Sequence, residues 1–518
     1  FKGQFSLHRP LILSFLVCCI LATAPIEAAK ILAVIPTPSI SHQIVFRPLT
    51  QELARRGHDV TVITTDPAFT KETAPANLTE IDVRDISYKI WKEKFIDEAE
   101  KGTKNALISQ METIFKIFAA VFDAQIKTDA LQKLINDKSQ TFDLLFIEAC
   151  FRPALAFTYV FKDVPVILVS SLGATPGNYD IIGAPDHPLL YPSILRQRLY
   201  KLSFWEKITE LYTHYQAVEL YKRNAVIENK VLRENFGPGI PSVEELGNNV
   251  DMLFLNVNPI FEGNRPVPPT VIYMGGLHQK RRKELPSVST KNGLIYISFG
   301  TNVDPSLLPA ERIQTMVRAF SKLPYKVLWK WNKPELEGRT DNIRISKWLP
   351  QADLLRHPNV KLFITQGGLQ STDEAITAAV PLIALKLIPR YSKQDFILPV
   401  FLNKLLSYSW TCVASKLTGI RYFIPSYRQN IEKLRSVMQD QPMPPLERAV
   451  WWTEYVLRHG AKHLRAPAAN MSWAEYLELD LVLIVLVSLI GTIAVLITTI
   501  YLLYKYLFRN INIKFKSN

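Results

Sequence analysis

Residues 30–64 decide the fold class, and they read KILAVIPTPSISHQIVFRPLTQELARRGHDVTVIT. The apolar run Lys30–Ile35 predicts a strand that is buried on both faces, as strands of parallel sheets are. Apolar residues then recur at helical spacing from Ile44 to Ala54, and Asp59–Thr64 predicts a second strand. A strand, a helix and a strand in this order indicate a parallel, doubly wound sheet.

The same pattern returns after a proline-rich connection, so the body of the chain divides into two α/β halves. We expect two Rossmann-like domains, over residues 30–257 and 291–466, the second with returning C-terminal helices, and a linker over 258–290. A ligand cleft is expected between the two halves. The further predicted strands cover residues 143–147, 165–169, 293–299, 326–329 and 360–364.

Composition limits the class of function. The chain has 518 residues, of which 48% are hydrophobic and 21% are charged, and this excludes a disordered protein. Four cysteines exclude a disulfide scaffold. The net charge of +14 could indicate nucleic acid, but the basic cluster Lys280–Lys283 has neither interleaved aromatic residues nor a groove-reading motif beside it. We therefore expect no nucleic-acid partner.

The two ends of the chain predict a membrane protein. Residues 1–29 have a basic start, a short apolar core and small residues at their end, as a secretory signal peptide has. Residues 481–504 carry no charge and are long enough to cross a bilayer as one transmembrane helix. Basic residues follow in 505–518, so this tail is expected in the cytosol and the body in the lumen, as in a single-pass type I protein.

Short motifs indicate the cellular compartment in which the protein is expected. The sequons at Asn77 and Asn470 would carry glycans on the lumenal side. Lys514 and Lys516 resemble the dilysine retrieval signal of endoplasmic reticulum membrane proteins, and a plain basic stop-transfer flank is the alternative interpretation. The predicted location is the endoplasmic reticulum membrane.

Residues 186–235 mix aromatic and aliphatic side chains with Lys and Arg, which predicts amphipathic helices. We expect these helices to pack on the core. The alternative is that they line an apolar pocket or lie on a membrane.

Residues 363–374 read FITQGGLQSTDE, so a predicted strand passes through two glycines into a helix. Free backbone N–H groups at a helix start can bind phosphate, and Gly367 and Gly368 permit close approach of the backbone. Neither a P-loop nor a dinucleotide fingerprint is present in this segment.

This segment and five others resemble the UDP-glycosyltransferase family of membrane-anchored detoxifying enzymes, and Thr365–Gln370 is most similar to its insect branch. The likeness extends from Lys30 to the tail. It implies the GT-B fold, with two Rossmann-like domains and a C-terminal transmembrane helix, the acceptor in the N-terminal half and the UDP-sugar in the C-terminal half. The other matching segments are 296–301 (YISFGT), 347–351 (KWLPQ), 440–443 (DQPM), 445–455 (PLERAVWWTEY) and 461–467 (AKHLRAP).

The resemblance also implies the residues that bind the donor. Trp348 would stack on the uracil, Gln351 would lie near the base and the ribose, and Glu374 would accept hydrogen bonds from the ribose hydroxyls. The residues implied around the pyrophosphate and the sugar are Thr301, Lys330, Gln366, Gly368, Gln370 and Gln394.

By the same resemblance, His42 is the catalytic base, in a loop directly after the first strand. A neutral imidazole would take the proton of an acceptor hydroxyl as that hydroxyl attacks the anomeric carbon. A carboxylate would stabilise the imidazolium. The family usually has Asp at that position, and this chain has Glu148, which is one methylene longer. Direct displacement implies inversion, and neither a metal nor another cofactor is expected.

One stretch, residues 384–425, departs from the family. The family usually has an Asp-Gln pair that binds the sugar hydroxyls. This chain has Arg390 and Tyr391 there, or Lys393 and Gln394 after a shift of three residues. Neither alignment restores the Asp, although Gln394 keeps the Gln.

The predicted function is transfer of a hexose from a UDP-sugar to hydroxyl groups of small lipophilic acceptors, in detoxification. Glucose is the first choice of sugar by the insect-type resemblance, and glucuronic acid is the second. The missing Asp favours one alternative, a catalytically impaired membrane protein that binds UDP or lipophiles. An acceptor such as ceramide would instead make the protein a lipid-sugar transferase. The sequence leaves a homo-oligomer open.

Overall fold

The computed structural model covers most of the predicted body. Residues 1–27 of the predicted signal peptide, Thr301, Gln394 with the divergent stretch up to residue 419, and the last residues of the tail lie outside the described residues. The structure describes residues 28–70, 72–100, 107–175, 177–191, 202–279, 283, 285, 292–300, 310–384 and 420–515.

The first half contains a parallel, seven-stranded sheet in the order β3-β2-β1-β4-β5-β6-β7. β1 and β4 are adjacent near its middle, and both are buried along almost their whole length, as their apolar sequences predict. Because all neighbouring strands are parallel, their C-terminal ends share one edge of the sheet. The strands are β1 (Lys30–Ile35), β2 (Asp59–Thr64), β3 (Leu78–Asp82), β4 (Leu144–Glu148), β5 (Val166–Ser170), β6 (Met252–Leu255) and β7 (Val271–Tyr273).

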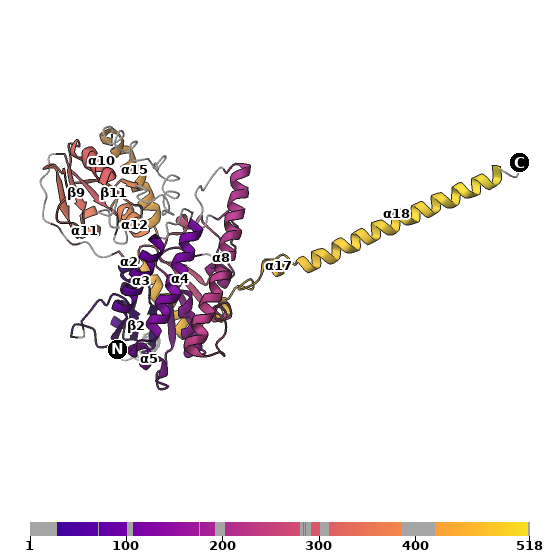
Figure 1. Ribbon diagram of the computed structural model, residues 1–518, viewed down its shortest axis with the longest axis horizontal. Helices are drawn as coiled ribbons and strands as arrows, with labels where there is room; N and C mark the ends of the chain where they lie inside the picture. The colour runs from indigo at the N-terminus through magenta and orange to yellow at the C-terminus, as the bar shows by residue number, and fades with distance from the viewer. Residues whose placement is uncertain are drawn as a thin grey trace, which may run out of the picture.

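Helices cover both faces of this sheet, and several of them are labelled in Figure 1. On one face, α2 (Ile40–Arg55) packs against α16 (Pro445–His459), so a helix that follows the second half returns to the first. On the other face, α4 (Leu107–Ile126) packs against α8 (Phe204–Phe236). The first half is thus a sheet between two helical layers.

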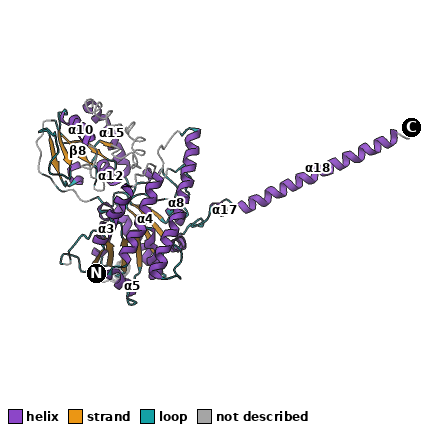
Figure 2. Cartoon of the chain, viewed as in Figure 1, coloured by secondary structure: helices purple, strands orange, loops and turns teal. Residues whose placement is uncertain are grey.

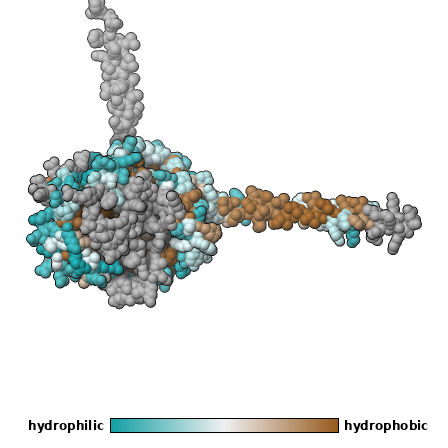
Figure 3. Space-filling model, turned by 90° about the horizontal axis from the view of Figure 1, so that it is seen from above, coloured by the Kyte–Doolittle hydropathy of each residue, from teal (hydrophilic) through white to brown (hydrophobic). Residues whose placement is uncertain are grey.

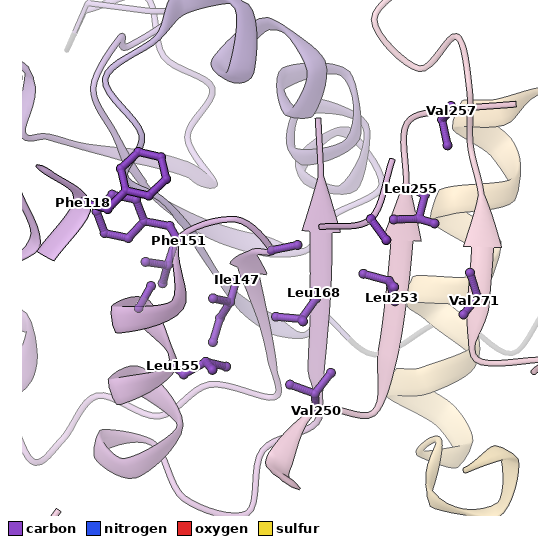
Figure 4. Packing of buried hydrophobic residues seen from close by; sticks show 14 of the residues in the cluster. Phe118, Ile147, Phe151, Leu155, Leu168, Val250, Leu253, Leu255, Val257 and Val271 are labelled. Atoms are coloured by element: carbon purple, nitrogen blue, oxygen red, sulfur yellow. The ribbon is translucent and has the colours of Figure 1, made fainter. Parts of the chain in front are cut away.

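The core under α4 fixes the edge of the sheet. Figure 4 shows Ile147, Leu168 and Leu253 on three neighbouring strands, within one buried apolar cluster. Phe151, just beyond β4, packs against Phe118 of α4 with ring centroids 4.8 Å apart. Burial of each such ring contributes about 2–3 kcal/mol, so the segment that follows β4 is anchored to the core.

The second half contains a parallel, five-stranded sheet in the order β10-β9-β8-β11-β12. Figure 2 shows its strands in orange, with β8 labelled. Its central strands β8 and β11 are almost completely buried. The strands are β8 (Leu294–Ser298), β9 (Lys326–Lys330), β10 (Ile343–Ser346), β11 (Val360–Thr365) and β12 (Leu382–Ala384), and the helices around them are α10 (Ala310–Ser321), α11 (Gln351–Leu355), α12 (Leu369–Thr377) and α15 (Ile420–Gln439).

The remaining elements are short, apart from α3. They are α3 (Arg84–Glu100), α5 (Asp129–Asn136), η1 (Arg152–Ala156), α6 (Phe157–Val160), α7 (Asn178–Ile182), α9 (Val243–Leu246), η2 (Gly247–Asn249), η3 (Pro259–Glu262), η5 (Lys462–Leu464) and α17 (Trp473–Tyr476).

The two parallel sheets confirm the predicted α/β class. The sequence analysis does not predict β3, β6, β10 or β12, which have three to five residues each. β3 and β10 are edge strands that are only partly buried, so their sequences lack a continuous apolar run. β7 lies within the predicted linker 258–290 and forms the other edge of the first sheet, opposite β3.

α8 covers most of the described part of residues 186–235, and its two ends differ in burial. Its C-terminal part buries Ala217, Leu220 and Leu232 against the core, as expected. Its first turn exposes Phe204 and Trp205, whose exposed fractions are 69% and 73%. The helix therefore packs on the core at one end and presents aromatic rings to the outside at the other.

The last helix, α18 (Leu479–Phe515), leaves the body as a long rod (Figure 1), and Figure 3 shows its surface as mostly hydrophobic. Residues Leu479–Phe508 have a mean hydropathy of 2.9, and none of the tested window is buried. By length and composition, this is the one helix among the described residues that could cross a membrane. It contains the predicted span 481–504.

Candidate active site

A histidine and a carboxylate meet at the C-terminal edge of the first sheet. His42 lies in the first turn of α2, shortly after β1, and Glu148 is the last residue of β4. Nδ1 of His42 is 2.5 Å from Oε1 of Glu148. Because β1 and β4 are adjacent and parallel, their ends bring together two residues that are 106 positions apart in the sequence.

The longer side chain of Glu148 fits this position. The side chain is completely buried, and its second oxygen, Oε2, accepts a hydrogen bond of 3.1 Å from the backbone N–H of Thr37. Both carboxylate oxygens are therefore hydrogen-bonded, which offsets the cost of burying the charge. The carboxylate is held in one orientation toward the imidazole.

The other ring nitrogen of His42 is open. A carboxylate only accepts hydrogen bonds, so we assign the ring hydrogen to Nδ1 and the lone pair to Nε2. No hydrogen bond joins Nε2 to any of the described residues, and 18% of the side chain is exposed. A hydroxyl group that reaches this edge of the sheet could therefore give its proton to Nε2.

The position of His42 corrects one expectation. The sequence analysis predicts His42 in a loop, but α2 begins at Ile40 and His42 belongs to its first turn. Ser39 has the extended backbone of an N-cap residue, and its carbonyl accepts from the backbone N–H of His42 at 2.9 Å. The helix thus starts earlier than the apolar spacing suggests, and it fixes the backbone of His42.

Ser171 and Thr37 were missed by the sequence analysis. Oγ of Ser171 lies 3.1 Å from Nδ1 of His42, and Thr37 donates its backbone N–H to Glu148. Thr37 follows β1 by two residues, and Ser171 comes directly after β5. The sequence signal for both was their position just beyond the C-terminal ends of predicted parallel strands.

A free thiol lies beside this pair. Sγ of Cys150 donates to Oε1 of Glu148 at 3.6 Å, so it belongs to the same polar cluster. Burial and the nearby Glu148 carboxylate raise the pKa of the thiol well above its ordinary value. Cys150 is therefore a protonated thiol at neutral pH and not a nucleophile.

In the second half, the start of α12 is free of side-chain caps. β11 ends at Thr365, Gly367 has a φ of +82°, and Gly368 is the N-cap residue without a side chain. A Cβ atom placed on Gly368 would meet nothing within 4 Å, so the space next to it is open. Backbone N–H groups and the helix dipole at such a start favour an anion.

Gln366 and Lys330 line the neighbouring loop. Gly300, just after β8, has a φ of +81°, and a Cβ atom there would come within 2.6 Å of Nε2 of Gln366. The positive φ favours glycine at position 300, and the amide of Gln366 would have to shift if a Cβ atom were present there. Nζ of Lys330 donates to the carbonyl of Gly300 at 2.8 Å, and burial lowers the pKa of this lysine.

Gln351 and Glu374 form a second polar pair near the same edge. Nε2 of Gln351 donates to Oε2 of Glu374 at 2.8 Å and to Oγ of Ser371 at 2.9 Å, and Oη of Tyr296 donates to Oε1 of Gln351 at 3.2 Å. Burial raises the pKa of Glu374, and the neighbouring Asp373 adds to this rise, while His278, Gln351 and Arg356 offset only part of it. This carboxylate retains lone pairs for further donors.

Trp348 presents its ring to the outside, with 63% of the residue exposed. Nζ of Lys330 lies 5.0 Å from the centre of the ring, which is a cation–π contact. An exposed indole beside polar groups offers a flat face on which an aromatic ligand can stack.

Gln370 joins the two halves. From the first turn of α12, its Nε2 donates to the backbone carbonyl of Ser41 at 2.5 Å. Ser41 precedes His42 in the chain, so the start of α12 lies next to the start of α2. The C-terminal edges of the two sheets therefore face each other across this contact.

Comparison with known proteins identifies the family. A family model described as "UDP-glucoronosyl and UDP-glucosyl transferase" matches residues 29–515. The chain belongs to the UDP-glycosyltransferase family. It is therefore a transferase, and the UDP-glycosyltransferase resemblance of the sequence is confirmed.

Two curated relatives of this UDP-glycosyltransferase come from a nuclear polyhedrosis virus and from Dactylopius coccus. It is 34% identical to the ecdysteroid UDP-glucosyltransferase of Spodoptera littoralis nuclear polyhedrosis virus, over 90% of this chain and 95% of that protein. It is also 31% identical to UDP-glucosyltransferase 2 of Dactylopius coccus, over 89% of this chain and 90% of that protein.

Solved structures confirm the GT-B fold of the UDP-glycosyltransferase. The calicheamicin glycosyltransferase CalG4 aligns with a TM-score of 0.55 at 14% identity, over 84% of this chain and 99% of that chain. An anthocyanidin 3-O-glucosyltransferase solved in complex with UDP aligns with a TM-score of 0.53 at 15% identity, over 83% and 99% of the two chains.

The described part of the UDP-glycosyltransferase brings most predicted site residues to the two facing edges. Their roles stay predictions, and Thr301 and Gln394 lie outside the described residues.

The two predicted glycosylation sequons differ in the surroundings of their asparagines. Nδ2 of Asn77 donates to the carbonyls of Ala54 and His58, whereas Asn470 is exposed.

Proposed function

We propose that this UDP-glycosyltransferase transfers glucose from UDP-glucose to a hydroxyl group of a small lipophilic acceptor, with inversion at the anomeric carbon. The observation that carries the proposal is the 2.5 Å contact between His42 and Glu148, with the open Nε2 of His42 beside the start of α12. The names of the relatives, which are UDP-glucosyltransferases, support glucose as the sugar.

The reaction begins with the acceptor hydroxyl. Nε2 of His42 takes the hydroxyl proton while the oxygen forms a bond to the anomeric carbon from the face opposite to UDP. The bond between that carbon and the β-phosphate oxygen breaks, and UDP leaves with the electron pair. Glu148 stays ionised and stabilises the imidazolium, which is the orienting role of the carboxylate in catalytic triads.

The donor is held by the second half. Trp348 stacks on the uracil, and Glu374 accepts hydrogen bonds from the ribose hydroxyls with Gln351 beside it. The backbone N–H groups at the start of α12 stabilise the charge that develops on the departing diphosphate. Lys330 adds a positive charge near that site. These groups supply the charge stabilisation from protein alone, and we infer no metal or other cofactor for the transfer.

The acceptor is a small lipophilic molecule with a free hydroxyl, bound by the first half. Several of the similar proteins are named for ecdysteroids, which supports a polycyclic alcohol as one test acceptor beside simple phenols. Conjugation of such compounds makes them more soluble in water, so we assign the enzyme to detoxification.

We also infer the location. The apolar helix α18 anchors the enzyme, the body lies in the lumen of the endoplasmic reticulum, and the basic tail lies in the cytosol. Exposure favours Asn470 as the glycan site, because the amide nitrogen of Asn77 already donates to two carbonyls.

Transfer by membranes that contain the full chain tests the proposal. With UDP-glucose and a panel of phenols and ecdysteroids, we expect a glucoside whose anomeric configuration is inverted, and UDP-glucuronic acid should give less product. His42→Ala should give none. UDP-glucose binding without any conjugate would overturn the proposal and favour the impaired binding protein, and a ceramide product would favour the lipid-sugar transferase.

A further inference from the structure

Cys150 completes a set of three different ligand atoms at the edge of the first sheet. The ligand atoms of His42, Glu148 and Cys150 all lie within 4.8 Å of one another. Sγ of Cys150 is 3.6 Å from Oε1 of Glu148, and Nδ1 of His42 is 2.5 Å from the same oxygen. The proposed glucosyl transfer uses the imidazole and the carboxylate but leaves the thiol without a role.

We propose that His42, Glu148 and Cys150 bind a zinc-like divalent cation, and that this cation inhibits the transferase. One imidazole nitrogen, one carboxylate oxygen and one thiolate sulfur are ligands that Zn²⁺ accepts, and three protein ligands leave a fourth position for water. Zinc bond lengths of about 2.0–2.3 Å place the ligand atoms of a tetrahedral site roughly 3.4–3.6 Å apart. The distance between Cys150 and Glu148 already fits, and the imidazole has to move by about 1 Å.

The inhibition follows from the tautomer of the imidazole. In the metal-free enzyme Nδ1 carries the hydrogen and Nε2 carries the lone pair. A cation on Nδ1 occupies that nitrogen, so the ring hydrogen moves to Nε2, and the proton of the Cys150 thiol goes to solvent. Nε2 then donates a hydrogen bond and cannot take the proton of an acceptor. This step rests on the proposed role of His42, whereas the binding of the cation does not.

The surroundings permit an ion to enter. Cys150 is partly exposed and 18% of the His42 side chain is exposed, while Glu148 lies beneath them. Oγ of Ser171 is 3.1 Å from Nδ1 of His42, and Oγ1 of Thr37 is 3.9 Å from Sγ of Cys150, so polar groups flank the site. The thiolate selects soft or borderline ions, and Mg²⁺ and Ca²⁺, which prefer oxygen ligands, are not expected to bind.

Cobalt tests the site without reference to activity. The full chain in detergent, titrated with Co²⁺, should develop the near-ultraviolet charge-transfer band of a cobalt–thiolate bond. The matched variants are Cys150→Ser and Cys412→Ser, because these are the two cysteines outside the predicted signal peptide. We expect the band to persist in Cys412→Ser and to disappear in Cys150→Ser. No band, or a band that survives in Cys150→Ser, would overturn the site.

Zinc tests the inhibition. Zn²⁺ should suppress glucosyl transfer in the unmodified enzyme and in Cys412→Ser, and Mg²⁺ should not. The inhibitory concentration, measured for each variant against its own metal-free transfer rate, should rise at least about tenfold in Cys150→Ser. Cys150→Ala is a second variant, used if thermal unfolding shows that Cys150→Ser is misfolded. Equal inhibition of Cys150→Ser would overturn the proposal. A chain with no transfer at all would refute the proposed function, and the cobalt titration would still decide the cation site.

Discussion

The two carboxylates of the candidate active site, Glu148 in the first half and Glu374 in the second, differ in how they are held. Glu148 is fully buried, and its two oxygens accept hydrogen bonds from His42 and from the backbone of Thr37. Glu374 receives a hydrogen bond from Gln351, its one donor among the described residues, and burial raises its pKa. The first half is therefore preorganised for proton transfer before any ligand binds, whereas the second half keeps a carboxylate that a ligand has to satisfy.

This difference predicts which half controls the rate and which controls donor binding. Preorganised groups lower the barrier without reorganisation during the reaction. An incompletely satisfied carboxylate contributes affinity when a ligand supplies hydroxyl donors. Changes at the first edge should therefore act on kcat, and changes at the second edge should act on the affinity for UDP-glucose.

The largest effect is expected for His42→Ala. Removal of a general base typically costs about 10²–10⁴-fold in kcat, and the Kd for UDP should stay unchanged because His42 lies in the other half. Single-turnover kinetics and calorimetry with UDP measure the two quantities. The control is His459→Ala, an exposed histidine at the end of α16, which should keep full activity. A weaker affinity for UDP in His42→Ala would contradict the separation of the two halves.

Glu148→Asp should lower kcat by about ten- to hundredfold, although it introduces the residue that the family usually has. The structure fits the longer side chain, so the shorter one would retract the carboxylate from Nδ1 by roughly 1 Å, a displacement that is costly at a catalytic site. The KM for UDP-glucose should not change. An Asp variant as fast as the natural enzyme would show that the loop after β4 readjusts, and that the geometry is not fixed by the core.

Glu374→Gln should weaken UDP-glucose binding by about 2 kcal/mol, which is roughly thirtyfold in Kd, because hydrogen bonds from the ribose hydroxyls to a charged acceptor are lost.

The same substitution should raise the free energy of unfolding of the ligand-free chain at neutral pH. A carboxyl whose pKa is higher in the folded than in the unfolded chain binds more protons when folded, so the free energy of unfolding falls as pH rises through that window. The charged Glu374 therefore lowers stability at neutral pH, and Gln removes that cost.

Thermal unfolding of the ligand-free chain over a pH series shows whether Glu374→Gln raises or lowers the stability. Glu374→Gln should unfold at the same or a higher temperature at neutral pH and lose the advantage in acid. Glu447→Gln, at an exposed position in α16, is the matched control and should change neither binding nor stability. A destabilised Glu374→Gln variant would mean that the carboxylate is satisfied before the donor binds.

Trp348→Ala should weaken UDP binding by about 1 kcal/mol, roughly fivefold, through loss of a stacking surface. Because Trp348 is 63% exposed, the unfolding temperature should stay the same. Trp451→Ala is the control, since this tryptophan is also exposed but lies on α16. Quenching of tryptophan fluorescence by UDP in the natural chain, and its absence in the Trp348 variant, would support the stacking directly.

The smallest effect is expected for Gln370→Ala. Loss of one hydrogen bond between the halves costs about 1 kcal/mol, or roughly fivefold in kcat/KM, because the start of α12 is no longer tied to Ser41 beside His42. Gln314→Ala, which removes a hydrogen bond within the second half, should leave kcat/KM unchanged. A larger loss in UDP affinity than in kcat would instead place Gln370 in the donor site.

The sequence predicted the elements that carry strong patterns. Continuous apolar runs located β1, β4, β8 and β11, because buried parallel strands need apolar residues on both faces. It failed for β3 and β10, which are partly buried edge strands, and for β6 and β12, which have only four and three residues. Such short or half-exposed segments show no clear hydrophobic periodicity. The start of α2 was placed too late, since apolar spacing does not report the extended Ser39 that begins the helix.

The sequence by itself determined the α/β class, the apolar C-terminal helix and the family, since these follow from periodicity, length and local motifs. Only the tertiary structure decided that Glu148 reaches His42, that Gln370 contacts Ser41 and that Cys150 joins the same cluster. The physical reason is that strands far apart in the chain end at one sheet edge. The contacts among their last residues depend on strand order and side-chain direction, which no local stretch of sequence contains.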